Sequence, residues 1–250
     1  MTGIYRLAEQ NIEIRSIHEQ VHILCADYRA DRDAEHADCA PAFSVETAQA
    51  DIEAERLLAD RIREAKGLPE QPFSDAYLET VAVHRKIAEK MPFYDTFLAH
   101  GSTVAVDGEA YLFAALSGTG KSTHTRLWRE LLGERAVMVN DDKPFLRVTE
   151  SGGTIAYGSP WDGKHRLSRN IAVPLRAVCL LERGEQNRIK EISKAEALPR
   201  LLILQFYRPV DPEALSKTMT LLDRMNPRFY RLQCNMDLSA AELAYNTMKG

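Results

Sequence analysis

Cysteine is scarce in this sequence, and its few residues are scattered. The four cysteines are Cys25, Cys39, Cys179 and Cys234, and no CxxC pair occurs among them. This spacing provides neither the paired ligands of a zinc knuckle nor the dense cross-links of a small disulfide-rich protein. We therefore expect free thiols, as in a reducing compartment.

Long apolar runs and an excess of one charge sign are also missing. No apolar run approaches the roughly 20 residues that span a bilayer, and the opening MTGIYRLAEQ lacks the regions of a signal peptide. The 32 Lys and Arg residues nearly balance the 36 Asp and Glu residues, so the net charge is only -4. Such a balance gives no general attraction to nucleic acid or to an anionic membrane. We expect a cytoplasmic protein with neither partner.

The rest of the composition is that of an ordinary globular protein, and the pattern of hydrophobic residues changes near residue 95. The 250 residues are 45% hydrophobic and 27% charged, which fits one or two domains. In residues 1–95, the short alternating segments of IYRLAEQNIEIRSIHEQVHILCADYRA predict two or three antiparallel strands. A loop, DRDAEHADCA, and two amphipathic helices over residues 48–67 and 74–90 follow. We interpret this α+β region as a lid, a partner surface or a substrate region.

Residues 96–250 alternate strands and helices around a glycine-rich loop. The strands STVAV and EAYLFAAL flank Asp107-Gly108, a strong hairpin signal, and the second strand leads into SGTGKST. A helix over residues 122–132 follows, and then the strand AVMVN, which ends at Asp141-Asp142. A right-handed crossover would place AVMVN beside EAYLFAAL, with both carboxyl ends on one edge. The sequence thus predicts an α/β fold with a mixed sheet and flanking helices.

The C-terminal part predicts further strands and helices. IAVPLRAVCLLERGEQNRIKEIS resembles a hairpin that turns at ERGEQN. Capping boxes at Ser193–Glu196 and at Ser239–Glu242 predict helix starts, as does Asp211-Pro212, and FYRLQCNM predicts a last strand.

The loop after EAYLFAAL nearly matches the phosphate-binding pattern GxxxxGK[ST]. Ala115 stands at the first glycine position, and a single methyl there is the mildest departure because it lies furthest from Lys121. Two glycines in the loop let backbone N–H groups converge on phosphate oxygens at a helix N-terminus. The expected nucleotide contacts are Ser117, Gly118, Thr119, Gly120, Lys121, Ser122 and Thr123.

In a phosphoryl-transfer reaction, two loop residues and the two aspartates would each have a separate role. Lys121 can reach the β and γ phosphates of ATP, and the hydroxyl of Ser122 can ligate the Mg²⁺ that bridges them. Asp141 and Asp142 would face the phosphates as metal ligand and general base, in an order that the sequence leaves open. The preference for ATP or GTP also stays open.

Four stretches carry a resemblance to a known family: HGSTVAV, SGTGKST, VNDD and IAVPLRAVCLLER. Over about residues 97–192 the chain resembles the HPr kinase/phosphorylase group, P-loop kinases related to phosphoenolpyruvate carboxykinase. The resemblance implies that His100, Lys121 and Asp142 are catalytic and that Ser122 binds Mg²⁺. The glutamate-bearing, glycine-rich segment that follows the aspartate pair in HPr kinase is not found here. A divergent relative with another acceptor, such as a peptide or a small hydroxyl compound, is expected.

In its place stands AYGSPWDGKHRLSRN, whose glycines and proline predict a loop. One reading is a solvated turn, since basic loops usually are. The other is an acceptor site or phosphate clamp, in which Lys164 or Arg166 stabilises the transferring charge. Trp161 and Asp162 complete the substrate candidates, with Arg166 counted among the catalytic ones.

Three functions fit the pattern. The first is an ATP- and Mg²⁺-dependent kinase acting on a hydroxyl of a small molecule, peptide or protein. The second is a nucleotide-responsive binding module without catalysis, and the third is an NTP hydrolase or phosphatase that uses the same site. A homo-oligomer is compatible with each of them.

Overall fold

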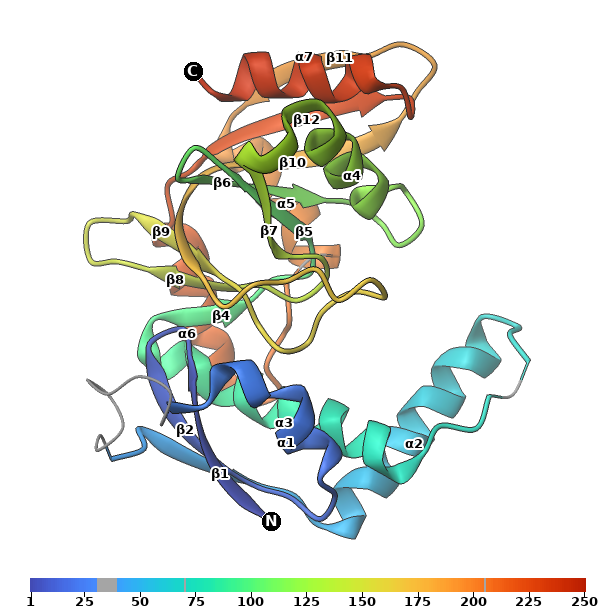
Figure 1. The fold of residues 1–250 in the computed structure, drawn as a ribbon, viewed down its shortest axis with the longest axis vertical. Helices are drawn as coiled ribbons and strands as arrows, with labels where there is room; N and C mark the ends of the chain where they lie inside the picture. Colours follow the sequence, from blue (N-terminus) through green and yellow to red (C-terminus); the bar gives the residue numbers. More distant parts are fainter. Residues whose placement is uncertain (31–39, 70, 205) are drawn as a thin grey trace. The chain divides into compact units, whose positions relative to one another are not determined.

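The chain divides into two compact units. The structure, a computed structural model, describes residues 1–30, 40–69, 71–204 and 206–250. Its units are Met1–Lys90 and Met91–Gly250 (Figure 1). Cys39 and nearly all of the predicted loop DRDAEHADCA fall outside the described residues. In the described part of the chain, no helix is both long enough and apolar enough to cross a membrane.

The first unit combines a small sheet with helices. Its elements are β1 (Thr2–Leu7), β2 (Gln10–Arg15), α1 (Gln20–Leu24), a 3₁₀ turn (Ala26–Tyr28), β3 (Phe43–Glu46), α2 (Gln49–Ala65) and α3 (Asp75–Lys90). β1 and β2 form the predicted antiparallel pair, and β3 adds to β2 in parallel. Of the two or three antiparallel strands that this region predicted, two are present, because residues 20–24 form the helix α1.

A buried carboxylate explains why the chain turns after β2. The fully buried Glu79 of α3 accepts hydrogen bonds from the backbone N–H groups of Ile17 and His18, both at 2.7 Å, and from the Thr47 hydroxyl at 2.6 Å. Burial alone would raise the pKa of Glu79, but these hydrogen bonds hold it below its usual value. Glu79 thereby joins the turn after β2, the end of β3 and α3.

The second unit contains a curled mixed sheet with helices on both faces. Its strands are β4 (Thr96–Leu98), β5 (Ser102–Val106), β6 (Glu109–Ala114), β7 (Ala136–Asn140), β8 (Phe145–Val148), β9 (Thr154–Tyr157), β10 (Ala172–Arg183), β11 (Arg188–Ile192) and β12 (Arg228–Cys234). Its helices are α4 (Lys121–Leu132), α5 (Lys194–Leu204), α6 (Pro212–Arg224) and α7 (Leu238–Met248), with 3₁₀ turns at Met91–Tyr94 and Gly133–Arg135. The strand order is β4-β8-β9-β10-β6-β5-β7, and β12 also pairs with β10.

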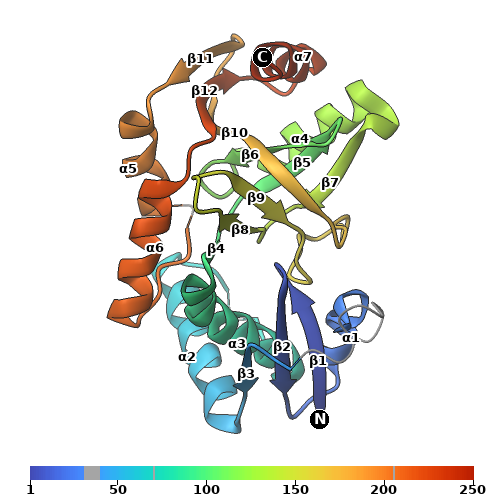
Figure 2. The ribbon, with the colours of Figure 1, turned by 90° about the vertical axis from the view of Figure 1, so that its left-hand side faces the viewer.

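Two apolar clusters hold these layers together. One contains Leu127 and Trp128 of α4 with Met248 of α7, and the other contains Leu201 of α5 with Leu221 of α6. Helices α4 and α7 therefore cover one face of the sheet, and α5 and α6 cover the other (Figure 2). The alternating strand residues that separate the two clusters give each face its own core.

The predicted hairpin is present, but it changes the predicted strand order. Asp107 and Gly108 have φ values of 52° and 85°, the left-handed pair that a tight two-residue turn requires. Because this turn pairs β5 with β6 at once, β5 occupies the position expected for β7. β7 adds to the far side of β5, antiparallel to it, and thus runs parallel to β6 one strand further away. The carboxyl ends of β6 and β7 still share an edge of the sheet.

Two other local predictions need correction. The segments 172–183 and 188–192 do not form a hairpin, because β12 lies between β10 and β11 and pairs with both. The last helix begins at Leu238 after Asp237, so the expected capping box at Ser239–Glu242 is wrong. The start of α6 is confirmed, with the Asp211 side chain accepting from the N–H of Glu213.

Candidate active site

The glycine-rich loop follows β6 and leads into α4. Gly118 has a φ of 80°, and Gly120, which precedes the first turn of α4, has a φ of 118°. An added Cβ would meet no atom within 4 Å at Gly118 and only Thr123 at 3.9 Å beside Gly120. The glycines are thus required by backbone conformation rather than by space, and the loop keeps the left-handed geometry of an anion-binding turn.

Ala115 fits its position without distorting the loop. It is 7% exposed and belongs to the apolar cluster that packs under α4. Its methyl group therefore points into the core, whereas its carbonyl oxygen accepts a hydrogen bond from Lys121 Nζ at 3.0 Å. The departure from the glycine pattern is accommodated by packing.

The side chain of Lys121 extends back over this loop, where its ammonium group contacts the Ala115 carbonyl oxygen. Burial lowers the pKa of Lys121 from its usual value, while the nearby charge of Asp142 acts in the opposite direction. The half-buried ammonium is within electrostatic reach of the acidic pair that follows β7. The structure therefore brings together the lysine and the aspartates that the sequence placed far apart.

Asp142 is paired with two cationic or titratable side chains. Its Oδ1 lies 3.3 Å from His100 Nε2 and 3.3 Å from Lys143 Nζ. Burial by itself would raise the pKa of Asp142, but the His100 hydrogen bond and the Lys143 charge hold it at about 2. Asp142 is consequently ionised at neutral pH and oriented from two sides.

Asp141 is held in place by contacts from the neighbouring strand β5 and from α4. Its Oδ1 accepts a 2.5 Å hydrogen bond from the hydroxyl of Ser102, which also contacts Thr125 Oγ1 at 2.8 Å. All three residues are buried. This network fixes the carboxylate of Asp141 beside the first turns of α4, the helix that carries Ser122.

Asn140 positions the acidic pair, a role that was not predicted from the sequence. It is fully buried, and its Oδ1 accepts hydrogen bonds from the N–H groups of Asp142 at 2.8 Å and Lys143 at 2.5 Å. Its Nδ2 donates to Ser159 Oγ at 3.1 Å and to the Trp161 carbonyl at 3.3 Å. Asn140 therefore sets the turn that aims the aspartates. The only signal for it was its place at the strand end.

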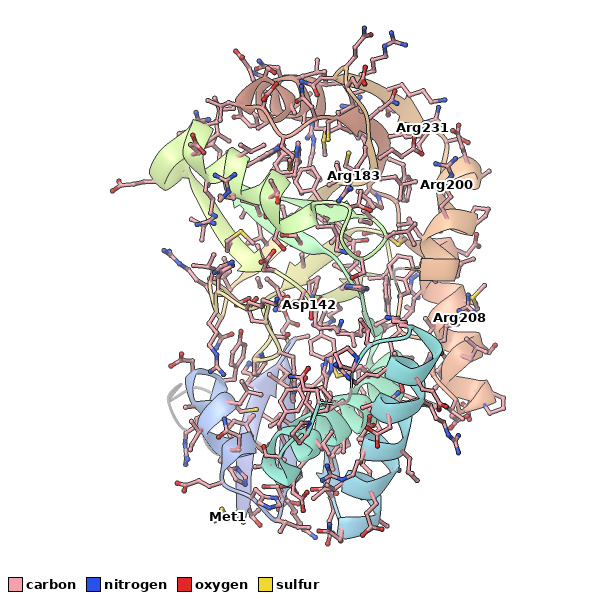
Figure 3. All side chains as sticks on the ribbon, turned by 90° about the vertical axis from the view of Figure 1, so that its right-hand side faces the viewer. Met1, Asp142, Arg183, Arg200, Arg208 and Arg231 are labelled. Carbon is pink, nitrogen blue, oxygen red and sulfur yellow. The ribbon has the colours of Figure 1, made fainter. Side chains whose placement is uncertain are left out.

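Arg183, the last residue of β10, was also missed. Its guanidinium donates to the carbonyl oxygens of Gly118 and Thr119, the second at 3.5 Å. Figure 3 locates it in this unit together with Asp142. Because these carbonyls belong to the glycine-rich loop, Arg183 supports the loop from the side that faces β10.

The predicted substrate residues lie in the loop over residues 158–170, and they differ in how far they are exposed to solvent. Trp161 is only 8% exposed, whereas Lys164 and Arg166 are exposed, and Arg166 has a left-handed φ of 47°. The Asp162 carboxylate accepts from the N–H groups of Asp141 at 3.0 Å, Gly163 at 2.6 Å and Ser168 at 2.8 Å. Asp162 thus shapes the loop. Roles for these residues toward a substrate stay a prediction.

A polar hollow lies beside Asp141. It has a volume of about 420 Å³ and is bordered by Ser122, Arg126, Arg129, Asp141, His165 and Leu167, among others. The Nε of Arg129 is buried and has no hydrogen-bond partner within the described part of the protein. The predicted loop therefore reaches this hollow through His165 and Leu167, while the side chain of Trp161 is packed in the interior.

The donor set next to the loop fits a magnesium ion shared with phosphates. Within the described residues, no cluster of three or more His, Cys, Asp or Glu side chains could hold a metal alone. Mg²⁺ in phosphoryl-transfer sites usually takes one or two carboxylates and completes its shell with water and substrate phosphates. The exposed hydroxyl of Ser122 and the carboxylates of Asp141 and Asp142 supply that chemistry.

Comparisons with known proteins add a weak likeness. No family model matches the chain, and no curated protein matches its sequence. Among solved structures, the chain is similar to the Hpr(Ser) kinase/phosphatase from Coxiella burnetii, with a TM-score of 0.34 and 11% identity. That match covers 61% of this chain and 99% of the other. The likeness is distant and concerns the fold, so the roles of the residues rest on their own geometry.

Proposed function

We propose that the protein is an ATP-dependent kinase that transfers the γ-phosphoryl group to a hydroxyl acceptor with the help of Mg²⁺. One observation carries this proposal: the Lys121 ammonium sits over a phosphate-type loop within electrostatic reach of Asp142. Phosphoryl transfer needs phosphate positioning and a group that orients the attacking oxygen, and both are supported at one sheet edge.

The chemical step assigns one task to each group. The acceptor oxygen forms a bond to the γ-phosphorus, the bond from the γ-phosphorus to the bridging oxygen breaks, and ADP leaves with those electrons. Loop N–H groups and Lys121 hold the phosphates, and Mg²⁺, when bound, neutralises charge that develops on them. Lys121 is also placed to stabilise the leaving diphosphate.

Asp142 receives the acceptor proton. With a pKa of about 2 it is a weak base, so it first accepts a hydrogen bond from the hydroxyl. The proton moves late, when bonding to phosphorus has made the oxygen acidic. His100 keeps the carboxylate ionised and oriented through its contact with Oδ1.

The acceptor approaches through the polar hollow beside Asp141. This hollow borders Ser122, at the start of α4, and carries Arg126 and Arg129, which favour an acceptor with an acidic group nearby. His165 and Leu167 are the contribution of the loop over residues 158–170. Arg166 remains a candidate for the transferring phosphoryl group if the loop changes its conformation on binding.

Label transfer tests the proposal. The protein is incubated with Mg²⁺, γ-labelled ATP and a cell extract, and labelled molecules are separated and counted. We expect one labelled acceptor with the natural protein and a loss of about 10²- to 10⁴-fold with Asp142→Asn, which cannot take the proton. Asp107→Asn, an equal chemical change at the exposed hairpin turn, where Asp107 pairs only with the surface residues Arg135 and Tyr245 among the described contacts, serves as the control and should transfer label normally.

Two results would refute the kinase assignment. ADP release that proceeds at the same rate with and without extract, without a labelled acceptor, indicates a hydrolase. Tight ATP binding with no ADP release at all indicates a nucleotide-responsive binding module.

A further inference from the structure

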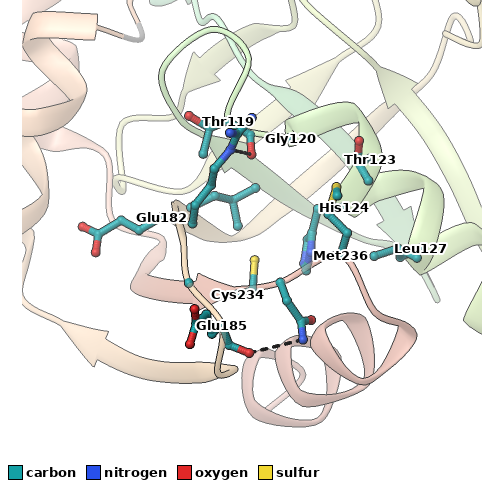
Figure 4. A pocket seen from close by; sticks show the side chains of 13 residues that line it. Thr119, Gly120, Thr123, His124, Leu127, Glu182, Glu185, Cys234 and Met236 are labelled. Atoms are coloured by element: carbon teal, nitrogen blue, oxygen red, sulfur yellow. Dashed lines mark hydrogen bonds between the residues drawn. The ribbon is translucent and has the colours of Figure 1, made fainter.

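Two hollows border the start of α4. One has a volume of about 540 Å³ and is bordered by His124 of α4 and by residues at the ends of β10 and β12 (Figure 4). The other is the polar hollow beside Asp141, to which the loop over residues 158–170 contributes two side chains. Asp141 and this loop therefore border one common space.

The side chain of Asp162 ties the loop over residues 158–170 to Asp141. Its Oδ1 accepts hydrogen bonds from the backbone N–H groups of Asp141 at 3.0 Å and Gly163 at 2.6 Å, and its Oδ2 accepts one from that of Ser168 at 2.8 Å. Two of these donors belong to the loop itself, and the third belongs to the acidic pair. Both oxygens of Asp162 are thus engaged in holding the backbone, which favours a supporting role over direct contact with a metal ion.

Gly163 lies against the carboxylate of Asp141. A Cβ added to Gly163 would stand 3.0 Å from Asp141 Oδ2 and 3.3 Å from its Cγ. The φ of Gly163 is not left-handed, so the missing side chain serves space rather than backbone conformation. The loop therefore approaches Oδ2 closely, and a glycine at this position leaves room around that oxygen.

The two carboxylate oxygens of Asp141 are in different surroundings. Oδ1 accepts the 2.5 Å hydrogen bond from Ser102, whereas Oδ2, beside Gly163, accepts no hydrogen bond from the described residues. Oδ2 is accordingly the oxygen that is available to a cation. Because Mg²⁺ demands ligands close to ideal octahedral positions, its affinity depends on how well such an oxygen is held in place.

We propose that Asp162 and Gly163 are positioning residues for Mg²⁺, which set the backbone and the carboxylate of Asp141 so that Oδ2 can bind the metal ion. The inference rests on the proposed function, because it assumes that Mg²⁺ binds together with ATP. Residues that orient a metal ligand without touching the metal typically change metal affinity about 10- to 100-fold when they are lost. The loop that borders the acceptor hollow thereby also sets the metal requirement.

The magnesium dependence of ATP binding tests this inference without measuring catalysis. Calorimetry gives the affinity for ATP with saturating Mg²⁺ and with a chelator, and the ratio of the two affinities is the factor by which the protein strengthens Mg²⁺ binding to ATP. Asp162→Ala should lower this ratio about tenfold or more and leave the affinity for ATP without Mg²⁺ unchanged. Asp162→Asn, which keeps an oxygen for the N–H of Asp141, should lower the ratio less.

Gly163→Ala provides an independent variant that keeps Asp162 and crowds Asp141 Oδ2. It should also lower the ratio. Gly153→Ala, in the turn between β8 and β9, is the matched control, because an added Cβ there also stands 3.0 Å from a side-chain oxygen, that of Thr149. This control should leave the ratio unchanged. Thermal unfolding identifies the variants that fold, and Asp162→Asn and Gly163→Ala keep the test decisive if Asp162→Ala does not.

Two outcomes separate this inference from the proposed function. If the folded variants at Asp162 and Gly163 keep the ratio of the natural protein, the positioning role is overturned, and these residues serve only the shape of the loop. If Mg²⁺ does not strengthen ATP binding by the natural protein, or if ATP does not bind at all, the proposed function fails and the positioning role fails with it.

Discussion

His100 Nε2 lies 3.3 Å from Asp142 Oδ1, and the backbone around both residues holds this contact in place. The N–H of Gly101 donates to the carbonyl of Asp142 at 3.1 Å, and the N–H of Ala99 donates to that of Pro144 at 3.0 Å. These two hydrogen bonds, one on each side of His100, fix its backbone relative to that of Asp142. The backbone thereby preorganises the pair, as the proposed role of Asp142 as proton acceptor requires.

Replacing Lys121 by Ala should weaken the binding of ATP far more than the binding of ADP. The ammonium reaches mainly the β and γ phosphates, so the triphosphate loses its strongest charge-assisted contact. Titration calorimetry with both nucleotides and Mg²⁺ measures the difference. Lys143→Ala, which removes a neighbouring cation outside the loop, is the comparison. An equal loss for ATP and ADP in Lys121→Ala would place the lysine away from the terminal phosphate.

Asn140→Ala should lower both stability and turnover. The substitution leaves the buried N–H groups of Asp142 and Lys143 without their acceptor, and we expect a loss of about 2–4 kcal/mol in the free energy of unfolding. Urea unfolding measures this, and label transfer measures turnover. Asn246→Ala, on the exposed side of α7, should change neither quantity. Wild-type stability in Asn140→Ala would show that the turn is held by other contacts.

The main effect of Trp161→Ala should be a loss of protein stability rather than a change in acceptor binding. The indole is nearly buried, so its removal leaves a cavity and costs about 3–5 kcal/mol of unfolding free energy. Arg166→Ala, five residues away on the exposed part of the same loop, should stay within about 0.5 kcal/mol. Thermal unfolding of both variants tests the contrast. Trp161→Ala with an unchanged melting temperature would return the indole to the list of acceptor-binding groups.

Stability should fall as the pH is lowered from about 6.5 to 4. Burial lowers the pKa of His124 to about 4 in the folded protein, against 6.5 in the unfolded chain. Between these values the unfolded chain binds more protons, so the contribution is complete above pH 6.5 and is lost on the way to pH 4. The full difference is roughly 3 kcal/mol.

Urea unfolding at several pH values checks this slope. In His124→Phe, the free energy of unfolding should change less with pH over the same window, whatever the variant's absolute stability, because Phe has no titrating ring. Asp142 is not a confounding group, because its pKa of about 2 places its effect below pH 4. An identical slope in His124→Phe would assign the pH dependence to other residues.

Local features of the second unit followed well from the sequence. The β5–β6 hairpin, the glycine loop, the helix after it and the Asp141-Asp142 end of β7 were all predicted, because each depends on neighbours in the chain. Asp107-Gly108 tolerates a left-handed turn, and Gly118 and Gly120 permit the loop conformation. The segment after β2 was not predicted, because Glu79, distant in sequence, captures the N–H groups that a strand would have paired.

The glycine-rich loop, with its lysine and serine, and the acidic pair could be located from the sequence alone, since spacing and backbone preference act over a few residues. Three features needed the folded chain: β5 separates β6 from β7, Asn140 orients the aspartates, and His124 lines a hollow at the ends of β10 and β12. Strand order and buried hydrogen bonds depend on which distant segments share a core, and that choice is made by the packing of the whole unit rather than by any local pattern.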